Sequence, residues 1–193
     1  MNNLQNQYWS GRLLGGYAGL KHTADKISQF IPKCKLYVEP FAGMASVAEY
    51  VKADKYVLND KSEYIVNYLW HKFKNENYLI TITDFEECIK TYDSPNTFFL
   101  FDPPWRAEHY SRKSESGKTP YFDRKPWEYY KKLFEIIPKL QGNWIICGVA
   151  DERQTRGYMS NHNYNKIIVE SDGKVIFGKK ARTLLVSNIE LKE

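Results

Sequence analysis

Short apolar stretches alternate with helical patterns over most of the chain, and this alternation limits the fold more than any other feature. The strand-like stretches are KLYVEPFAG, KYVLND, YLITITDF, FFLFDPPW and NWIICGVA. Helical spacing of apolar residues is found in MASVAEYVKA, SEYIVNYLWHKF and PWEYYKKLFEIIPKL. Strands that alternate with helices predict an α/β fold, in which helices cover both faces of a mostly parallel sheet.

The C-terminal part of the chain breaks this alternation. The stretches YNKIIVES and RTLLVSNI read as two strands joined by a turn at SDGK. A terminal hairpin in such a sheet places one antiparallel strand near the sheet edge. Because the sequence shows no internal repeat, low-complexity stretch or linker, we expect one domain over residues 1–193.

Charge and cysteine content narrow the class of protein. The 193 residues carry a formal net charge of +5. This excess favours a polyanionic partner, although the same charge also serves an ordinary solvated surface. The three cysteines lack the spacing of a disulfide framework or a zinc site, so we expect a reducing compartment and no metal. The sequence shows neither a signal peptide nor a run of roughly 20 apolar residues, which predicts a cytoplasmic protein without a membrane partner.

Acidic residues follow the ends of four successive predicted strands. They are Glu39, Asp60, Asp84 and Asp102. Ligands of parallel α/β sheets bind outside the carboxyl ends of the strands, so these side chains are expected at one edge. A single acid there is usually a helix cap, but four together predict a binding site.

The residue types at this edge suit an adenosine that carries a cationic amino-acid end. Gly43 lets the backbone pass close to a ligand, and Glu39 would repel phosphate and favour an amine. Asp60 suits ribose hydroxyls, and Asp84 suits the adenine amino group while Phe85 packs on the ring. The sequence has no Walker lysine motif and no complete G-x-G-x-x-G. We therefore predict S-adenosylmethionine as cofactor, with S-adenosylhomocysteine as product and no metal.

The stretch DPPW, Asp102 to Trp105, suits chemistry on the amine of a nucleobase. The lone pair of such an amine is delocalised into the ring, so two acceptors aimed at its hydrogens would make it a better nucleophile. The Asp102 carboxylate is one acceptor, and the Pro103 carbonyl is the other, held by the restricted torsions of Pro103 and Pro104. Trp105 offers a face on which a flipped-out base can stack.

These motifs, in this order, resemble the DNA adenine N6-methyltransferases of the Dam type. DPPW matches the family's D-P-P-Y/W/F motif, EPFAGMAS is similar to its cofactor loop, and YAGLK to its W-A-G-G-K segment. LNDKSEYIVNYL resembles the ribose-binding segment, ITDFEECI the D-F pair at the cofactor adenine, and RTLLVSN the closing strand. The resemblance implies a Rossmann-like class I S-adenosylmethionine-dependent methyltransferase fold, with a seven-stranded sheet and one antiparallel strand near its edge. The resemblance also implies five further cofactor-binding residues: Tyr17, Lys21, Pro40, Phe41 and Ser46.

The chain departs from the family pattern at a few positions. Ala45 stands where the family has the second glycine of the cofactor loop, Tyr17 replaces a tryptophan, and Leu20 replaces a glycine. Between Lys61 and Thr83 the sequence holds little beyond one helix and one strand, where members of the family carry a substantial target-recognition insert, so the chain lacks most of that insert. The chain therefore resembles a minimal form of the enzyme.

A segment rich in basic and aromatic residues follows the DPPW motif. We expect residues 106–125 to form a mobile loop that binds nucleic acid, because basic and aromatic side chains alternate along it. The candidate contacts are Arg106, Tyr110, Arg112, Lys113, Lys118, Tyr121, Phe122 and Arg124. A solvated surface loop is the alternative interpretation.

The sequence thus predicts a site-specific DNA methyltransferase that acts on the N6 amine of a flipped-out adenine. The same chemistry on RNA adenine or on the cytosine amine is an alternative, as is a silent nucleic-acid-binding subunit. DNA is the expected partner, with a homodimer or a separate specificity partner also compatible. A role in restriction-modification is one of several open roles, and a nucleoid location in a prokaryotic or viral-host cell would follow.

Overall fold

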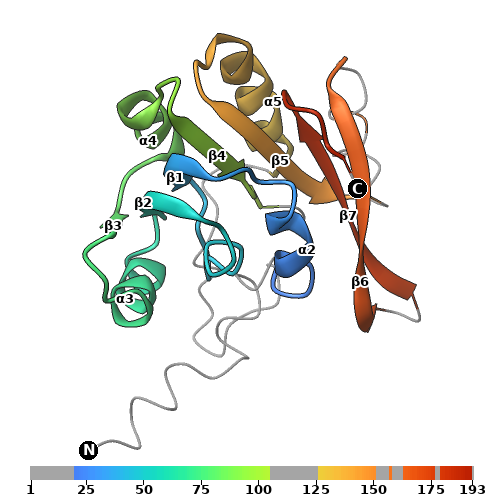
Figure 1. Ribbon diagram of the computed structural model, residues 1–193, viewed down its shortest axis with the longest axis horizontal. Helices are drawn as coiled ribbons and strands as arrows, with labels where there is room; N and C mark the ends of the chain where they lie inside the picture. Colours follow the sequence, from blue (N-terminus) through green and yellow to red (C-terminus); the bar gives the residue numbers. More distant parts are fainter. Residues whose placement is uncertain (1–19, 105–125, 151–156, 158–162, 177–178, 193) are drawn as a thin grey trace, which may run out of the picture.

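The computed structural model describes residues 20–104, 126–150, 157, 163–176 and 179–192. Its centre is a seven-stranded sheet with the strand order β3-β2-β1-β4-β5-β7-β6 (Figure 1). The strands are β1 (Cys34–Glu39), β2 (Ala53–Asn59), β3 (Tyr78–Thr81), β4 (Thr97–Phe101), β5 (Asn143–Val149), β6 (Asn165–Ile176) and β7 (Lys179–Ser187). The first five are parallel, and β7 runs antiparallel to both β5 and β6. The predicted sheet is therefore confirmed, with its antiparallel strand next to the edge strand.

Helices cover both faces of this sheet. They are α2 (Ala24–Ser28), α3 (Glu63–Lys72), α4 (Phe85–Tyr92) and α5 (Pro126–Ile136), which continues into the 3₁₀-helix η2 (Ile137–Lys139). In Figure 1, α2 and α3 lie on one face, while α4 and α5 lie on the other. None of the described helices has the length and apolar character that crossing a membrane requires.

Strand β4 shows how the sequence divides the core between the two faces. All five of its residues are buried. Phe98 and Leu100 pack on the side of α2 and α3, whereas Phe99 and Phe101 pack on the side of α4 and α5. This alternation follows from the period of two residues in a strand. A strand that is apolar on both faces must lie in the middle of a covered sheet, and β4 does.

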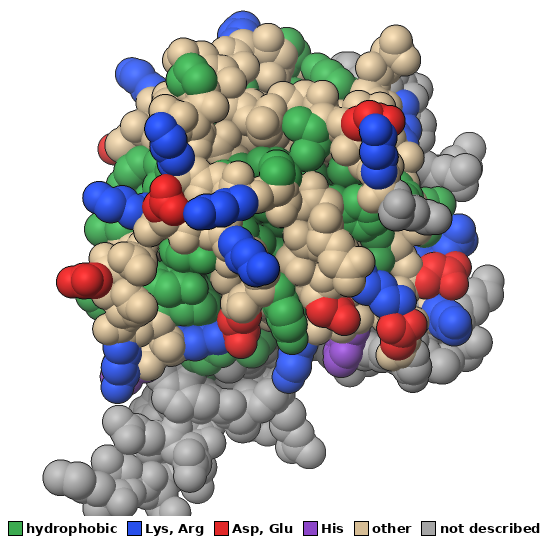
Figure 2. Space-filling model, viewed as in Figure 1, with side chains coloured by type: hydrophobic (Ala, Val, Ile, Leu, Met, Phe, Trp, Pro, Cys, Tyr) green, Lys and Arg blue, Asp and Glu red, His purple; other side chains and the backbone are tan. Residues whose placement is uncertain are grey.

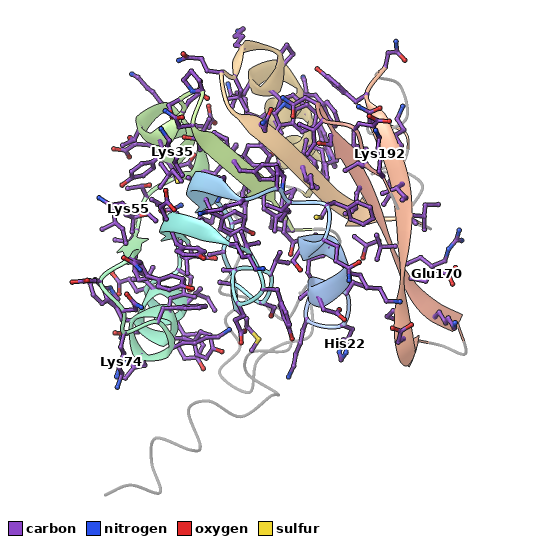
Figure 3. All side chains as sticks on the ribbon, viewed as in Figure 1. His22, Lys35, Lys55, Lys74, Glu170 and Lys192 are labelled. Atoms are coloured by element: carbon purple, nitrogen blue, oxygen red, sulfur yellow. The ribbon has the colours of Figure 1, made fainter. Side chains whose placement is uncertain are left out.

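Apart from Glu39, which is buried, the charged side chains that the structure describes lie outside the fully buried core. Figure 2 shows lysine and arginine side chains on the face in view, interspersed with acidic ones. The charged residues labelled in Figure 3, such as Lys35, Lys74 and Glu170, project away from the sheet. The positive net charge is therefore not concentrated into a single-sign patch on this face.

Two local predictions are wrong. The stretch MASVAEYVKA, residues 44–53, was expected to be a helix, but it forms a series of turns that lead directly into β2. Gly43 and Ala45 both have positive φ angles, 49° and 48°, which a right-handed helix start does not allow. The turn expected at SDGK is instead a register shift within β6, between Glu170 and Val175. The strand continues to Ile176 because a β-bulge absorbs the extra residues.

Candidate cofactor and active site

The residues of the candidate site lie at one edge of the sheet, at the ends of four neighbouring parallel strands. The order β3-β2-β1-β4 places their carboxyl ends side by side. Glu39 ends β1, Asp60 follows β2, Asp84 precedes α4 after β3, and Asp102 follows β4. The structure thus brings these acids to the same edge, where a shared ligand can reach loops that are far apart in sequence.

The loop after β1 is held from two sides. Two of its residues, Gly43 and Ala45, have positive φ angles, and the Ala45 N–H donates to the Ala42 carbonyl at 2.6 Å, which makes a tight turn. The Gly43 N–H donates to Oδ2 of Asp60 at 3.1 Å. Lys72, from α3, donates to the Met44 carbonyl at 2.7 Å. Because both flanks are fixed by other elements, the loop has its shape before any ligand binds.

Glu39, the last residue of β1, is a buried acid directly before this loop, with only 4% of its surface exposed. Its Oε1 accepts a hydrogen bond of 2.7 Å from the Tyr37 hydroxyl. Burial raises the pKa of Glu39 to about 7, and this rise is opposed by the Tyr37 hydrogen bond, the charge of Lys72 and the Ala48 N–H. A carboxyl group that titrates near neutrality and lies close to a backbone turn can pair with an amine.

Asp60 and Asp84 each already accept backbone hydrogen bonds. Besides the Gly43 N–H on its Oδ2, Asp60 accepts the Ser62 N–H on Oδ1 at 2.9 Å. Burial raises the pKa of Asp60 to about 6, although these N–H donors oppose the rise. Asp84 caps α4, because its Oδ1 accepts the Glu86 N–H at 3.0 Å. Each acid keeps lone pairs for a ligand while it fixes its own loop.

An aromatic cluster lies beneath this edge. The rings of Phe41 and Phe85 stack at a centroid distance of 4.8 Å, and Tyr129 of α5 meets both edge-on at 5.7 Å. Phe85 is only 3% exposed, whereas Phe41 is partly exposed. The structure therefore places Phe85 in the buried layer and leaves Phe41 as the ring within reach of a ligand. Lys61 links the loop after β2 to the same cluster, since its Nζ donates to the Tyr129 hydroxyl at 3.1 Å.

The start of the DPPW motif lies beside the end of β5. Asp102 is partly buried, Pro103 is buried and Pro104 is partly buried. Residue 102 comes directly after the pair Phe101–Ile146 of strands β4 and β5. The pKa of the Cys147 thiol is raised mainly by burial and further by the negative charge of Asp102, which reflects the closeness of the two side chains.

The other predicted site residues are placed only in part. Lys21 is exposed in the turn before α2, Pro40 is buried and Ser46 is partly buried. Several predicted residues lie outside the described part of the chain: Tyr17, Trp105, Arg106, Tyr110, Arg112, Lys113, Lys118, Tyr121, Phe122 and Arg124. The described residues include no group of three or more His, Cys, Asp or Glu side chains that could hold a metal ion.

Two functional contributions were missed from sequence. Asn59 is fully buried at the end of β2 and bonds to the loops on both sides of it. Lys72 holds the loop after β1 through the Met44 carbonyl and pairs with Glu49 at 2.5 Å. The signals for Asn59 were its place directly before the strand-end acid and within the segment LNDKSEYIVNYL, whereas Lys72 gave none, because its partner lies 28 residues away.

The residues at this edge fit S-adenosylmethionine. Glu39 offers a buried acid for the cationic amino end, and the lone pairs left on Asp60 and Asp84 suit hydroxyl and amino groups. The partly exposed Phe41 ring suits the adenine. This donor set contains acceptors and an aromatic face but no cluster of cations for a pyrophosphate, which matches the cofactor predicted from the sequence.

Comparison with protein families agrees with the resemblance seen in the sequence. The model of the D12 class N6 adenine-specific DNA methyltransferase family matches residues 17–76. This segment contains β1, the cofactor loop, β2 and α3, and it ends before the DPPW motif. No curated protein sequence matches the chain. Residues 61–83, all of them described, contain α3 and β3 alone, as the interpretation of a minimal form requires.

Solved structures share the fold at low sequence identity. An rRNA methylase from Streptococcus thermophilus aligns with a TM-score of 0.54 at 11% identity, over 86% of this chain and 92% of that chain. A candidate methyltransferase from Streptococcus mutans in complex with SAH aligns with a TM-score of 0.52 at 12% identity, over 88% and 97%. Spermidine synthase from Thermotoga maritima gives 0.55 at 10% identity, over 88% of this chain and 60% of that one.

At these identities the likeness concerns the fold alone. The fold is the mixed α/β fold of S-adenosylmethionine-dependent methyltransferases, as predicted. Together, the family match and the fold support S-adenosylmethionine-dependent methylation as the activity of this chain.

Proposed function

We propose that the chain is an S-adenosylmethionine-dependent DNA methyltransferase that modifies the exocyclic N6 amine of adenine. One observation supports this proposal above the others. The Asp102–Pro104 part of DPPW follows β4, directly beside β1, whose loop lies in the segment matched by the adenine-specific DNA methyltransferase family. This strand order supports the proposal, because methyl transfer to an amine needs the acceptors of the amine close to the bound cofactor.

In this proposal the strand-end residues bind the cofactor. Glu39 pairs with its amino group, and Asp60 accepts from the ribose. Asp84 accepts from the adenine amine, and Phe41 covers the ring while Phe85 supports Phe41 from below. S-adenosylmethionine supplies the methyl group when it is bound. The loops need little rearrangement, because Asp60 and Lys72 already hold the turn at Gly43 and Met44.

The DPPW residues act on the amine. Asp102 and the Pro103 carbonyl accept hydrogen bonds from its two N–H groups and localise its lone pair on the nitrogen. This stabilises the positive charge that develops on nitrogen as the methyl group is transferred. Trp105 stacks on the base, and the basic and aromatic residues of 106–125 hold the strand from which it is flipped. Because the methyl group passes directly to the amine nitrogen, no covalent intermediate with the enzyme is formed, and the methylated amine then loses a proton to solvent.

The biological setting follows from the substrate. An enzyme that modifies DNA acts where the DNA lies, which is the cytoplasm or nucleoid of a prokaryotic or viral-host cell. Because only α3 and β3 occupy residues 61–83, sequence selection would come from residues 106–125 or from a partner, either a second copy or a separate specificity subunit.

The test is methyl transfer from labelled cofactor to DNA and to RNA of matched base composition. We expect label in DNA, and a loss of about 100-fold or more for Asp102→Asn, the scale of removing one electrostatic contact to the transition state. Asp54→Asn removes an equally charged, exposed side chain at the opposite end of β2 and should leave the rate unchanged. Label in RNA alone would support the RNA alternative, and no transfer to either polymer would reject the proposal.

A further inference from the structure

Asn59 is a buried polar side chain at the candidate site whose amide groups are all hydrogen-bonded within the protein. It is the last residue of β2, which lies between β1 and β3, and its exposed fraction is 0%. An amide buried to this extent must satisfy its hydrogen bonds within the protein, since an unpaired one costs about 1–3 kcal/mol. Its partners therefore show what this side chain does.

Both ends of the Asn59 amide are fully used. The Nδ2 group donates to the Pro40 carbonyl and to the Thr83 carbonyl, each at 3.0 Å. The Oδ1 atom accepts the Thr83 N–H at 3.0 Å and the hydroxyls of Thr81 and Thr83 at 2.9 and 3.1 Å. With two donors and one carbonyl oxygen, the side chain has no bonding capacity left for a ligand. Asn59 therefore cannot act as a cofactor contact itself.

The two groups of partners belong to different loops. Pro40 is the first residue of the loop after β1, which contains Gly43. The buried acid Glu39 lies directly before Pro40. Thr83 immediately precedes Asp84 and Phe85. The backbone reinforces the same link, because the Asn59 carbonyl accepts the Ala42 N–H at 2.8 Å. One side chain thus connects the two loops across β2.

We propose that Asn59 is a positioning residue that sets the separation between the two halves of the cofactor site. This inference rests on the proposed function, in which the loop after β1 binds the amino-acid end and the loop before α4 binds the adenine. A ligand that spans both loops gains from their fixed spacing, as a two-part ligand gains from correctly spaced sites. A ligand that contacts one loop alone gains nothing from it.

This difference gives a direct test. The dissociation constants of S-adenosylhomocysteine and 5′-methylthioadenosine are measured for each variant by calorimetry or competition. Methylthioadenosine lacks the amino-acid end, so it reaches only the ribose and adenine side. Asn59→Asp keeps the shape but turns the two donors into acceptors that face the Pro40 and Thr83 carbonyls. We expect at least a tenfold loss for S-adenosylhomocysteine and less than a twofold change for methylthioadenosine.

A second variant covers the case in which Asn59→Asp does not fold. Thr83→Val removes only the hydroxyl that donates to Asn59, and it should weaken S-adenosylhomocysteine several-fold while methylthioadenosine stays within twofold. Thr97→Val is the matched control, because it removes a buried threonine hydroxyl that bonds the Tyr92 carbonyl at the start of β4. It should change neither constant.

The outcomes separate the two proposals. Equal weakening of both ligands by Thr83→Val, or no weakening of either, overturns the positioning role while the wild-type protein still binds S-adenosylhomocysteine. Failure of the wild-type protein to bind S-adenosylhomocysteine overturns the proposed function as well. A selective loss for the longer ligand, absent in Thr97→Val, supports the role of Asn59.

Discussion

Ala45 is the position where the structure makes its sharpest prediction about backbone strain. It lies in the cofactor loop with a φ angle of 48° and is 1% exposed. An L-residue in this conformation brings its Cβ close to its own backbone, and glycine does not. The Dam-type methyltransferases, which the sequence resembles, have a glycine at this position. We therefore consider the substitution Ala45→Gly, with Ala48→Gly as a matched control in the same loop.

The expected magnitude follows from three terms. Glycine relieves about 1–2 kcal/mol of left-handed strain at Ala45. The substitution also destabilises the folded protein in two ways: it removes the buried methyl group, at about 0.8 kcal/mol, and it gives the unfolded chain more freedom, at about 0.5–1 kcal/mol. The terms nearly cancel at Ala45. Ala48 is equally buried at 1% exposure and has no positive φ, so only the losses apply there and sum to about 1.5 kcal/mol.

The measurement is the free energy of unfolding from denaturant titration, with equal slopes required for all three proteins. We expect Ala45→Gly to lie within about 1 kcal/mol of the wild-type protein, and Ala48→Gly to be less stable than Ala45→Gly by about 1–2 kcal/mol. Equal destabilisation by the two substitutions would refute the reasoning, because it would mean that Ala45 carries no conformational strain.

Three further predictions concern stability. Burial raises the pKa of Glu39 from its ordinary 4.5 to about 7, so its contribution to the free energy of unfolding is complete below pH 4.5 and is lost as the pH rises through 7. Melting curves should show that Glu39→Gln removes the decline in stability between pH 4.5 and 7, and an unchanged decline would contradict the burial of this acid. Tyr129→Phe removes the hydroxyl that accepts from Lys61 but keeps the ring contacts, so urea titration should show a loss of about 0.5–1.5 kcal/mol, against several kcal/mol for Tyr129→Ala. A Cβ at Gly142 would lie 2.7 Å from a backbone oxygen, so the same titration should show that Gly142→Ala lowers the free energy of unfolding by about 1–3 kcal/mol. A Cβ at Gly157 would meet none of the described atoms within 4 Å, so Gly157→Ala should lower it by less than about 0.5 kcal/mol. Similar losses at both glycines would argue against the close packing at Gly142.

The placement of the strand-end acids could be predicted from sequence, because it depends only on the order of elements. Apolar runs alternating with helices imply parallel strands, and parallel strands bring their carboxyl ends to one edge. Glu39 and Asp102 needed no further information, since each directly follows or ends a buried strand. The hairpin at the C-terminus likewise identified the antiparallel strand.

The geometry of the loops could not be predicted in the same way. Residues 44–53 have helical composition, but Gly43 and Ala45 take left-handed angles that no local pattern reveals. The burial of Phe85 depends on Tyr129, more than 40 residues later in the chain. The role of Asn59 depends on three strand ends meeting around one amide. These features arise from tertiary contacts, which periodicity and propensity do not contain.

The central claim is that this chain methylates adenine in DNA at N6, and nucleoside mass spectrometry tests it most directly. DNA from cells that express the wild-type protein, and from cells that express Asp102→Asn, is digested to nucleosides and compared. The account predicts N6-methyladenine with the wild-type protein and none above background with Asp102→Asn. N4-methylcytosine in place of N6-methyladenine, or equal amounts of N6-methyladenine from both proteins, would contradict it.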